Sequence, residues 1–96
     1  MDLGELTLAT VEPLVGETFA VLVEPTAIEI VLESATTLGA RPGGRDPFTL
    51  VFRGPREPLL PQHTYALEHA DLGVLEIFIV PIGRDGDATS YEAIFT

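Results

Sequence analysis

The two histidines of the chain, His63 and His69, are the residues best suited to metal binding or proton transfer, but their spacing separates them. Their six-position separation on a strand corresponds to about 20 Å at ~3.3 Å per residue, so one metal ion cannot bind both side chains. We therefore predict no metal site. His69 precedes Ala70 and Asp71, which read as a turn, and we expect it to cap that turn or to lie exposed.

Other residue types that carry catalysis are rare or wrongly spaced. The chain has no cysteine, and Ser34 and Ser90 lie outside the G-x-S-x-G pattern of a hydrolase nucleophile. It has no lysine, and hence no phosphate-binding P-loop. The segment Asp85-Gly86-Asp87 matches only a fragment of a calcium loop and is better explained as a turn. We predict a protein that is not an enzyme and needs no cofactor. Carboxylate-based hydrolysis is a weaker alternative.

Arginines provide the best remaining candidate for a binding site, because four of the five lie between positions 41 and 56. This cluster comprises Arg41, Arg45, Arg53 and Arg56. Proline stiffens the bend Arg53-Gly54-Pro55-Arg56, and the planar guanidinium of arginine suits carboxylates and phosphates. We predict a binding corner made by Arg53, Arg56, His63 and Tyr65 that faces an acidic partner. The simpler alternative is that these arginines serve local charge balance and solubility.

The overall charge excludes several kinds of partner. A net charge of -10 argues against nucleic acid, where Lys and Arg supply most of the affinity, and against anionic membrane surfaces. The first residues have neither the basic region nor the apolar region of a secretory signal, so we expect a cytoplasmic protein. The absence of lysine and asparagine, whose codons are A-rich, suggests a GC-rich bacterial genome.

Alternating apolar and polar residues predict six short strands, bounded by proline and glycine. The predicted strands cover residues 18–23, 28–33, 48–53, 63–69, 74–81 and 91–95. A turn at Glu24-Pro25-Thr26 should join the first two strands. Thr10 reads as the start of a helix of one or two turns, which Gly16 ends and whose Leu14 and Val15 should face inward.

Six strands without intervening helices predict one all-β domain over residues 1–96. Because open strand edges are a liability, we expect an antiparallel meander closed into a small barrel or roll, with one short N-terminal helix at an end. The predicted core includes Phe52, Leu67 and Phe78.

Three stretches of the sequence carry a family resemblance: PGGRDPFTLVFRGPREPLLPQHTYALEH, LGVLEIFIVPIG and YEAIF. With them the chain resembles the DUF6916 family of small bacterial proteins, a domain of unknown function, over nearly its whole length. The resemblance implies a compact β domain and a link to tail-collar, phage-tail-like proteins. It supplies no catalytic residues.

These observations lead to two functional hypotheses. The first is a non-enzymatic binding or structural accessory module with a protein partner, linked to a phage-tail-like or tail-collar assembly. The alternative is a small-ligand-binding β-barrel with Arg53 and Tyr65 near its mouth. We also predict a homodimer in which Arg53 or Arg56 contacts acidic residues of the other copy.

Overall fold

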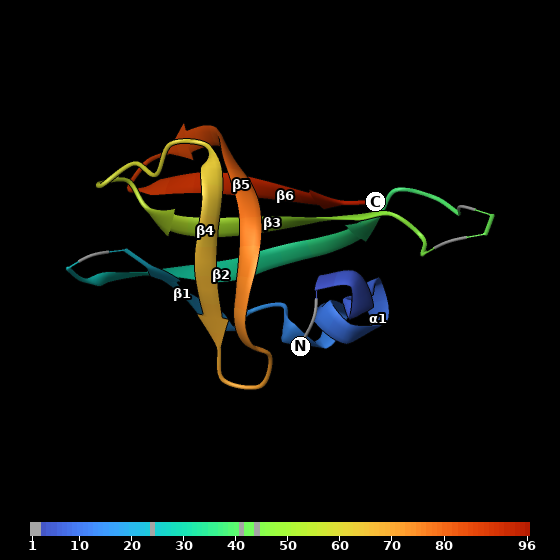
Figure 1. Cartoon of the computed structure of the whole chain (residues 1–96). Coiled ribbons are helices and arrows are strands. Elements are labelled where there is room, and N and C mark those ends of the chain that lie inside the picture. The colour runs from blue at the N-terminus through green and yellow to red at the C-terminus, as the bar shows by residue number, and fades with distance from the viewer. Residues whose placement is uncertain (1–2, 24, 41, 44) are drawn as a thin grey trace.

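The computed structural model describes residues 3–23, 25–40, 42–43 and 45–96, and its strands form a closed antiparallel barrel (Figure 1). The predicted Glu24 of the first turn and Arg41 of the arginine cluster lie outside the described residues. The six strands are β1 (Thr18–Leu22), β2 (Ala27–Thr37), β3 (Phe48–Pro55), β4 (His63–His69), β5 (Gly73–Asp85) and β6 (Ala88–Phe95). The six predicted strands and the closed barrel are therefore confirmed.

The strand order departs from a simple meander at two places. The order around the barrel is β1-β2-β3-β6-β5-β4, so β3 pairs with β6 and β1 pairs with β4. The chain thus forms two three-stranded units, β1 to β3 and β4 to β6, which join at both ends. Proline helps to explain why β3 and β4 do not form a hairpin, because Pro55 ends β3 and Pro58 and Pro61 remove backbone donors from the link to β4.

Two long strands, β2 and β5, belong to both layers of the flattened barrel. In β2, residues 27–31 pair with β1 and residues 31–37 pair with β3. In β5, residues 73–79 pair with β4 and residues 80–85 pair with β6. Each strand changes register near the change of partner, between Leu32 and Ser34 in β2 and between Pro81 and Gly83 in β5. The two layers therefore cross, as β4 does over β2 and β3 in Figure 1.

A short helical segment covers one end of the barrel. It consists of η1 (Leu3–Glu5), α1 (Leu8–Val11) and η2 (Glu12–Leu14). The predicted start at Thr10 was wrong: Thr7 is the N-cap of α1, and its hydroxyl accepts a hydrogen bond from the Thr10 amide at 3.3 Å. Gly16 ends the segment with a φ of +94°, as predicted. No helix in the described ranges is long and apolar enough to span a membrane.

The barrel interior is filled by large apolar side chains. Phe52 and Leu67 are buried as predicted, and Leu14 of the helical segment joins the same core, whereas Val15 is 43% exposed. The prediction for Phe78 was wrong, since its side chain is 51% exposed. Around Phe78, strand β5 is apolar on both faces apart from Glu76, so alternation was a weak guide to which face is inward.

Candidate binding site between β5 and β6

Strands β5 and β6 separate where β5 passes from one layer to the other. Their last register pair is Val80 with Glu92. Beyond it, residues 77–79 pair with β4 and residues 93–95 pair with β3. Within the described part of the chain, the two edges that face each other there have no strand partner. Pro81, which lacks an amide proton, lies at the register shift beside this point.

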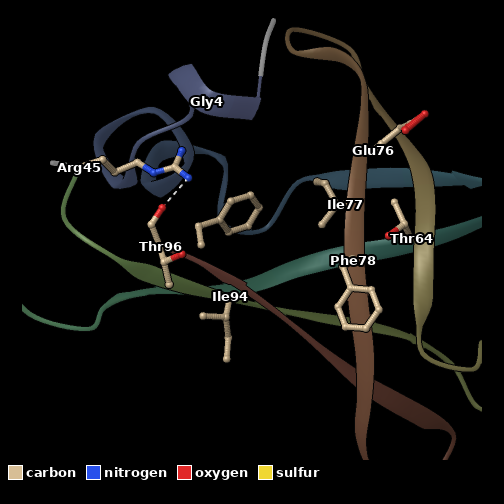
Figure 2. A pocket seen from close by; sticks show the side chains of 9 residues that line it. Gly4, Arg45, Thr64, Glu76, Ile77, Phe78, Ile94 and Thr96 are labelled. Atoms are coloured by element: carbon tan, nitrogen blue, oxygen red, sulfur yellow. Dashed lines mark hydrogen bonds between the residues drawn. The ribbon is translucent and has the colours of Figure 1, made fainter.

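A pocket of 390 Å³ lies at this separation, which we call the β5–β6 split (Figure 2). Its lining comes from both strands, from β4, from η1 and from the segment before β3. The lining residues are Gly4, Arg45, Thr64, Glu76, Ile77, Phe78, Ile94, Phe95 and Thr96. Phe78 and Ile94 are 51% and 59% exposed, although both are large and apolar. Water therefore contacts apolar surface on both sides of the split.

The apolar surface continues from the split onto the neighbouring outer face. Val51 of β3 and Val80 of β5 flank Glu92 of β6 in the strand register. All three are half-buried. Glu92 lies two residues before Ile94 on β6, so the two side chains share the outer face of that strand. These side chains extend the apolar surface of the split, with Glu92 as an acid among them.

The two charged residues of the pocket differ in their surroundings and lie at opposite ends of it in Figure 2. The guanidinium of Arg45 donates to the carbonyl oxygens of Leu6 at 2.6 Å and Thr96 at 3.0 Å. It also lies 5.8 Å from the centroids of the Phe48 and Phe95 rings. Arg45 therefore ties the helical segment to β6. Glu76 is exposed, and in the described residues it has no ion pair.

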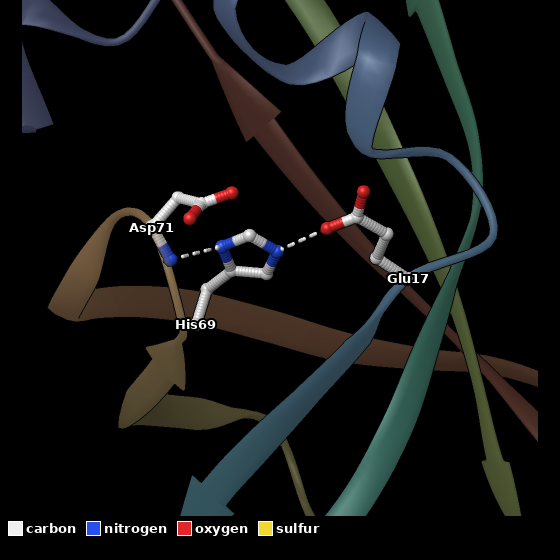
Figure 3. Close-up of side chains that lie close together, drawn as sticks. All are labelled: Glu17, His69 and Asp71. Carbon is white, nitrogen blue, oxygen red and sulfur yellow. Dashed lines mark hydrogen bonds and ion pairs between the residues drawn. The ribbon is translucent and has the colours of Figure 1, made fainter.

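A second polar group, formed by Glu17, His69 and Asp71, lies where β1 meets β4 (Figure 3). The backbone amide of Asp71 donates to His69 Nδ1 at 3.1 Å, so Nδ1 carries the lone pair. The ring proton is then on Nε2, which donates to Glu17 Oε1 at 2.7 Å. Of the two predicted alternatives, a turn cap or an exposed ring, the structure shows the turn cap, and the ring is buried with 4% exposure.

Three potential ligand atoms of this group lie within 4.8 Å of one another, which raises the question of a metal site. The hydrogen bonds do not fit one. Nδ1 already uses its lone pair for the Asp71 amide, and Nε2 uses its proton for Glu17. Figure 3 places the imidazole between the two carboxylates. The arrangement is that of a latch between the start of β1 and the end of β4.

The predicted binding corner is divided in the structure into separate contacts. Arg53 lies 3.8 Å from Glu33, and both side chains are about half exposed. The guanidinium of Arg56 donates to the carbonyl of Gly86 at 3.0 Å, in the β5–β6 turn. Both arginines therefore contact their own chain, and an acidic partner or a second copy would have to compete with these contacts.

His63 and Tyr65 form the other part of that corner, and their rings meet edge to face with centroids 5.3 Å apart. The Tyr65 hydroxyl donates to the Pro61 carbonyl at 2.7 Å. Burial, with a smaller effect of Tyr91, raises the pKa of Tyr65 above 10.0. None of the four predicted residues lines the β5–β6 split.

Sequence reasoning missed the residues at the split because they look like core. Phe78 and Ile94 are apolar residues within strands, and the hydrophobic pattern assigns such residues to the interior. A signal was present in Glu76, since residues two apart on a strand share a face. The charge of Glu76 places Phe78 on the outer face of β5, with Ile77 inward.

A family comparison agrees with the extent of this fold. The sequence profile described as Domain of unknown function (DUF6916) matches residues 6–95, from the helical segment to the end of β6. No curated protein and no solved structure matched the chain. The match covers the barrel, both charged residues of the pocket and the latch. The chain therefore belongs to the DUF6916 family.

Proposed function

We propose that this protein is a non-enzymatic binding module that docks onto a protein partner through the β5–β6 split. The observation that carries the proposal is the exposure of Phe78 and Ile94, at 51% and 59%, beside a pocket between unpaired strand edges. Exposed apolar groups in a concave site favour association, because covering them removes apolar area from water at roughly 25 cal/mol per Å².

The polar residues of the pocket support binding over catalysis. They are Arg45, Thr64, Glu76 and Thr96. A hydrolytic site needs a nucleophile next to a base, or two facing carboxylates, and this set offers neither a histidine nor a second acid. The larger setting that we propose, a phage-tail-like or tail-collar assembly, rests on the sequence resemblance alone. A bacterial source is proposed from the same resemblance and from the absence of lysine and asparagine, and a cytoplasmic location from the lack of a signal-like first segment.

A small-ligand-binding barrel is the second candidate, and the size of the pocket favours it. At 390 Å³ the pocket falls within the range of about 300–1,000 Å³ that small-molecule sites occupy. Such a ligand would contact Phe78 and Ile94, not Arg53 or Tyr65 as the sequence suggested.

Comparative affinity capture from a lysate of the source organism tests the proposal. The baits are the wild-type protein, the double variant Phe78→Ser/Ile94→Ser and the control Val74→Ser. Val74 is also 51% exposed and lies on the same outer face of β5, but it does not line the pocket.

We expect one protein to be captured by wild type and control and to fall by about tenfold with the double variant, which is ~1.4 kcal/mol. Equal capture by all three baits would overturn the proposal. Native mass spectrometry of the purified protein addresses the second candidate. A bound small molecule that the double variant loses would favour the ligand-binding barrel.

A further inference from the structure

The two edges of the β5–β6 split offer more than apolar surface, because each presents backbone groups. Residues 77–79 of β5 pair on one side with β4, and residues 93–95 of β6 pair on one side with β3. In the described ranges their other sides face the split without strand partners. Backbone N–H and C=O groups at such an edge are ready to pair with an added strand.

The side chains at the split suit an extended segment whose residues alternate. An added strand presents every second side chain to the same face, with a repeat of about 6.6 Å. Its apolar residues would lie against Phe78 and Ile94, which belong to opposite walls of the pocket. Glu76 lies on the same outer face of β5 as Phe78, so a basic residue that meets Glu76 would share a face of the segment with its apolar residues, two positions along.

Charge selects the chemistry of that segment. Glu76 lines the pocket and has no ion pair in the described residues, and Glu92 interrupts the neighbouring apolar patch. The positive charge of Arg45 is held at the other end by the Leu6 and Thr96 carbonyls. A second copy of this chain would bring a further net charge of -10, which opposes self-association at this face.

We propose that the β5–β6 split takes an extended segment of a partner protein as an added β-strand, with apolar residues and a basic residue at alternate positions on its outer face. This inference rests on the proposed function and specifies how the partner binds. The segment would hydrogen-bond to one or both free edges, place its apolar side chains against Phe78 and Ile94, and direct an arginine or lysine toward Glu76.

A synthetic peptide of roughly seven residues is a suitable probe of an edge of this length. It carries one arginine and two valines at alternate positions, on one face, with threonine at the positions between them. Two control peptides isolate the two parts of the inference. One has the same sequence with alternate amides N-methylated, which keeps the charge and removes strand pairing. The other replaces arginine with glutamate. Binding is followed by fluorescence anisotropy, and amide exchange is followed by NMR of the labelled protein.

We expect slowed exchange at amides within residues 77–79 or 93–95, and binding about tenfold weaker for each control peptide, equivalent to ~1.4 kcal/mol. Phe78→Ser/Ile94→Ser should weaken binding similarly, and Glu76→Gln should reduce its dependence on salt. Val74→Ser should leave the affinity unchanged.

Equal binding of the N-methylated peptide, or protection elsewhere on the barrel, would overturn strand addition. If lysate capture still depended on Phe78 and Ile94, the proposed function would stand and only this binding mode would fail. Dimerisation that Phe78→Ser/Ile94→Ser abolishes in sedimentation experiments would also overturn the inference, because a second copy would then occupy the split.

Discussion

The β1–β4 seam and the β5–β6 split are both weak points of the barrel, and they differ in what fills them. Among the described residues the seam has two register pairs, Ala20 with Glu68 and Val21 with Leu67. Yet Phe19, Val21, Leu67 and His69 are all buried there. The split begins where the pairing of β5 with β6 ends, and the side chains of Phe78 and Ile94 remain exposed there.

Side chains, then, decide whether a gap in a backbone ladder is closed. At the seam the rings of Phe19 and His69 pack with centroids 4.7 Å apart, and His69 binds Glu17 across the junction. At the split Phe78 is 51% exposed. A place where pairing is sparse but packing is dense is structural, whereas a place where edges and apolar groups are both uncovered is available to a partner.

The largest expected effect comes from removing a ring behind the closed seam. Phe52 is 0% exposed and meets Phe19 edge to face with centroids 5.3 Å apart. Phe52→Ala should cost roughly 3–5 kcal/mol by leaving a cavity. The matched change at the split, Phe78→Ala, should cost less than about 1 kcal/mol. Urea denaturation measures both, and similar losses would mean that the split is packed like the seam.

The β1–β3 unit has a corresponding junction, where β2 changes its partner from β1 to β3. Strand β3 leaves β2 after the pair of Val31 with Arg53, and Gly54 follows directly. A Cβ at Gly54 would lie 2.7 Å from Ile30 Cγ2, so this junction is filled. Gly54→Ala should cost roughly 1–3 kcal/mol by overpacking.

Gly83 provides the control, because a Cβ there would meet nothing within 4 Å and its φ is not positive. Gly83→Ala should change the free energy of unfolding by less than about 0.5 kcal/mol. Equal changes in the free energy of unfolding for Gly54→Ala and Gly83→Ala would show that the two junctions are packed alike.

The latch at the seam should have a smaller effect. Glu17→Gln keeps the shape of the side chain. It removes the negative charge of the carboxylate that accepts the hydrogen bond from His69 Nε2. Since Glu17 is 48% exposed, we expect a loss of roughly 0.5–1.5 kcal/mol. Hydrogen exchange should quicken at β1 and β4 amides. Glu29→Gln, an exposed change on β2, should leave that exchange as it was. Unchanged exchange in Glu17→Gln would show that ring packing alone closes the seam.

The smallest effect concerns Tyr65, on the half of β4 that has no register pair with β1. Its pKa is raised above 10.0 in the folded protein, so its contribution to stability is complete below that pH. The contribution is lost as pH rises from 10.0 through the folded pKa, because the unfolded chain ionises first. Denaturation between about pH 9 and about pH 11 should show a shallower decline for Tyr65→Phe than for wild type. Parallel declines would exclude Tyr65 as the cause.

Alternation along the sequence was enough to locate strands and the core where one face of a strand is polar. β4 has the predicted bounds. Leu67 is buried, as predicted from the polar Glu68 on the opposite face of the strand. In β5 the residues around Phe78 are apolar on both faces, and Glu76 is the one nearby charge that distinguishes Phe78 on the outer face from Ile77 on the inner face. The β5–β6 split could not be predicted from local patterns, because it arises where β5 exchanges one partner strand for another.

Contacts between distant residues were also beyond local patterns. Glu17 and His69 are 52 positions apart, and the residues around each of them do not predict their contact. The arginine cluster was visible as composition, but its contacts were not. Arg56 donates to a backbone carbonyl 30 positions away, in a turn that the sequence marked only as polar.

The joining of two three-stranded units has a consequence for how the chain reaches its native state. Each unit is built from hairpins between neighbouring strands, which form quickly because little chain must be ordered to close them. Neither unit can cover its apolar face alone, and the contacts that join them, between β3 and β6 and between β1 and β4, span long stretches of sequence. We therefore expect the docking of the two units to limit the folding rate. Core substitutions at β3–β6 should slow folding, whereas changes at the late-closing latch should mainly speed unfolding.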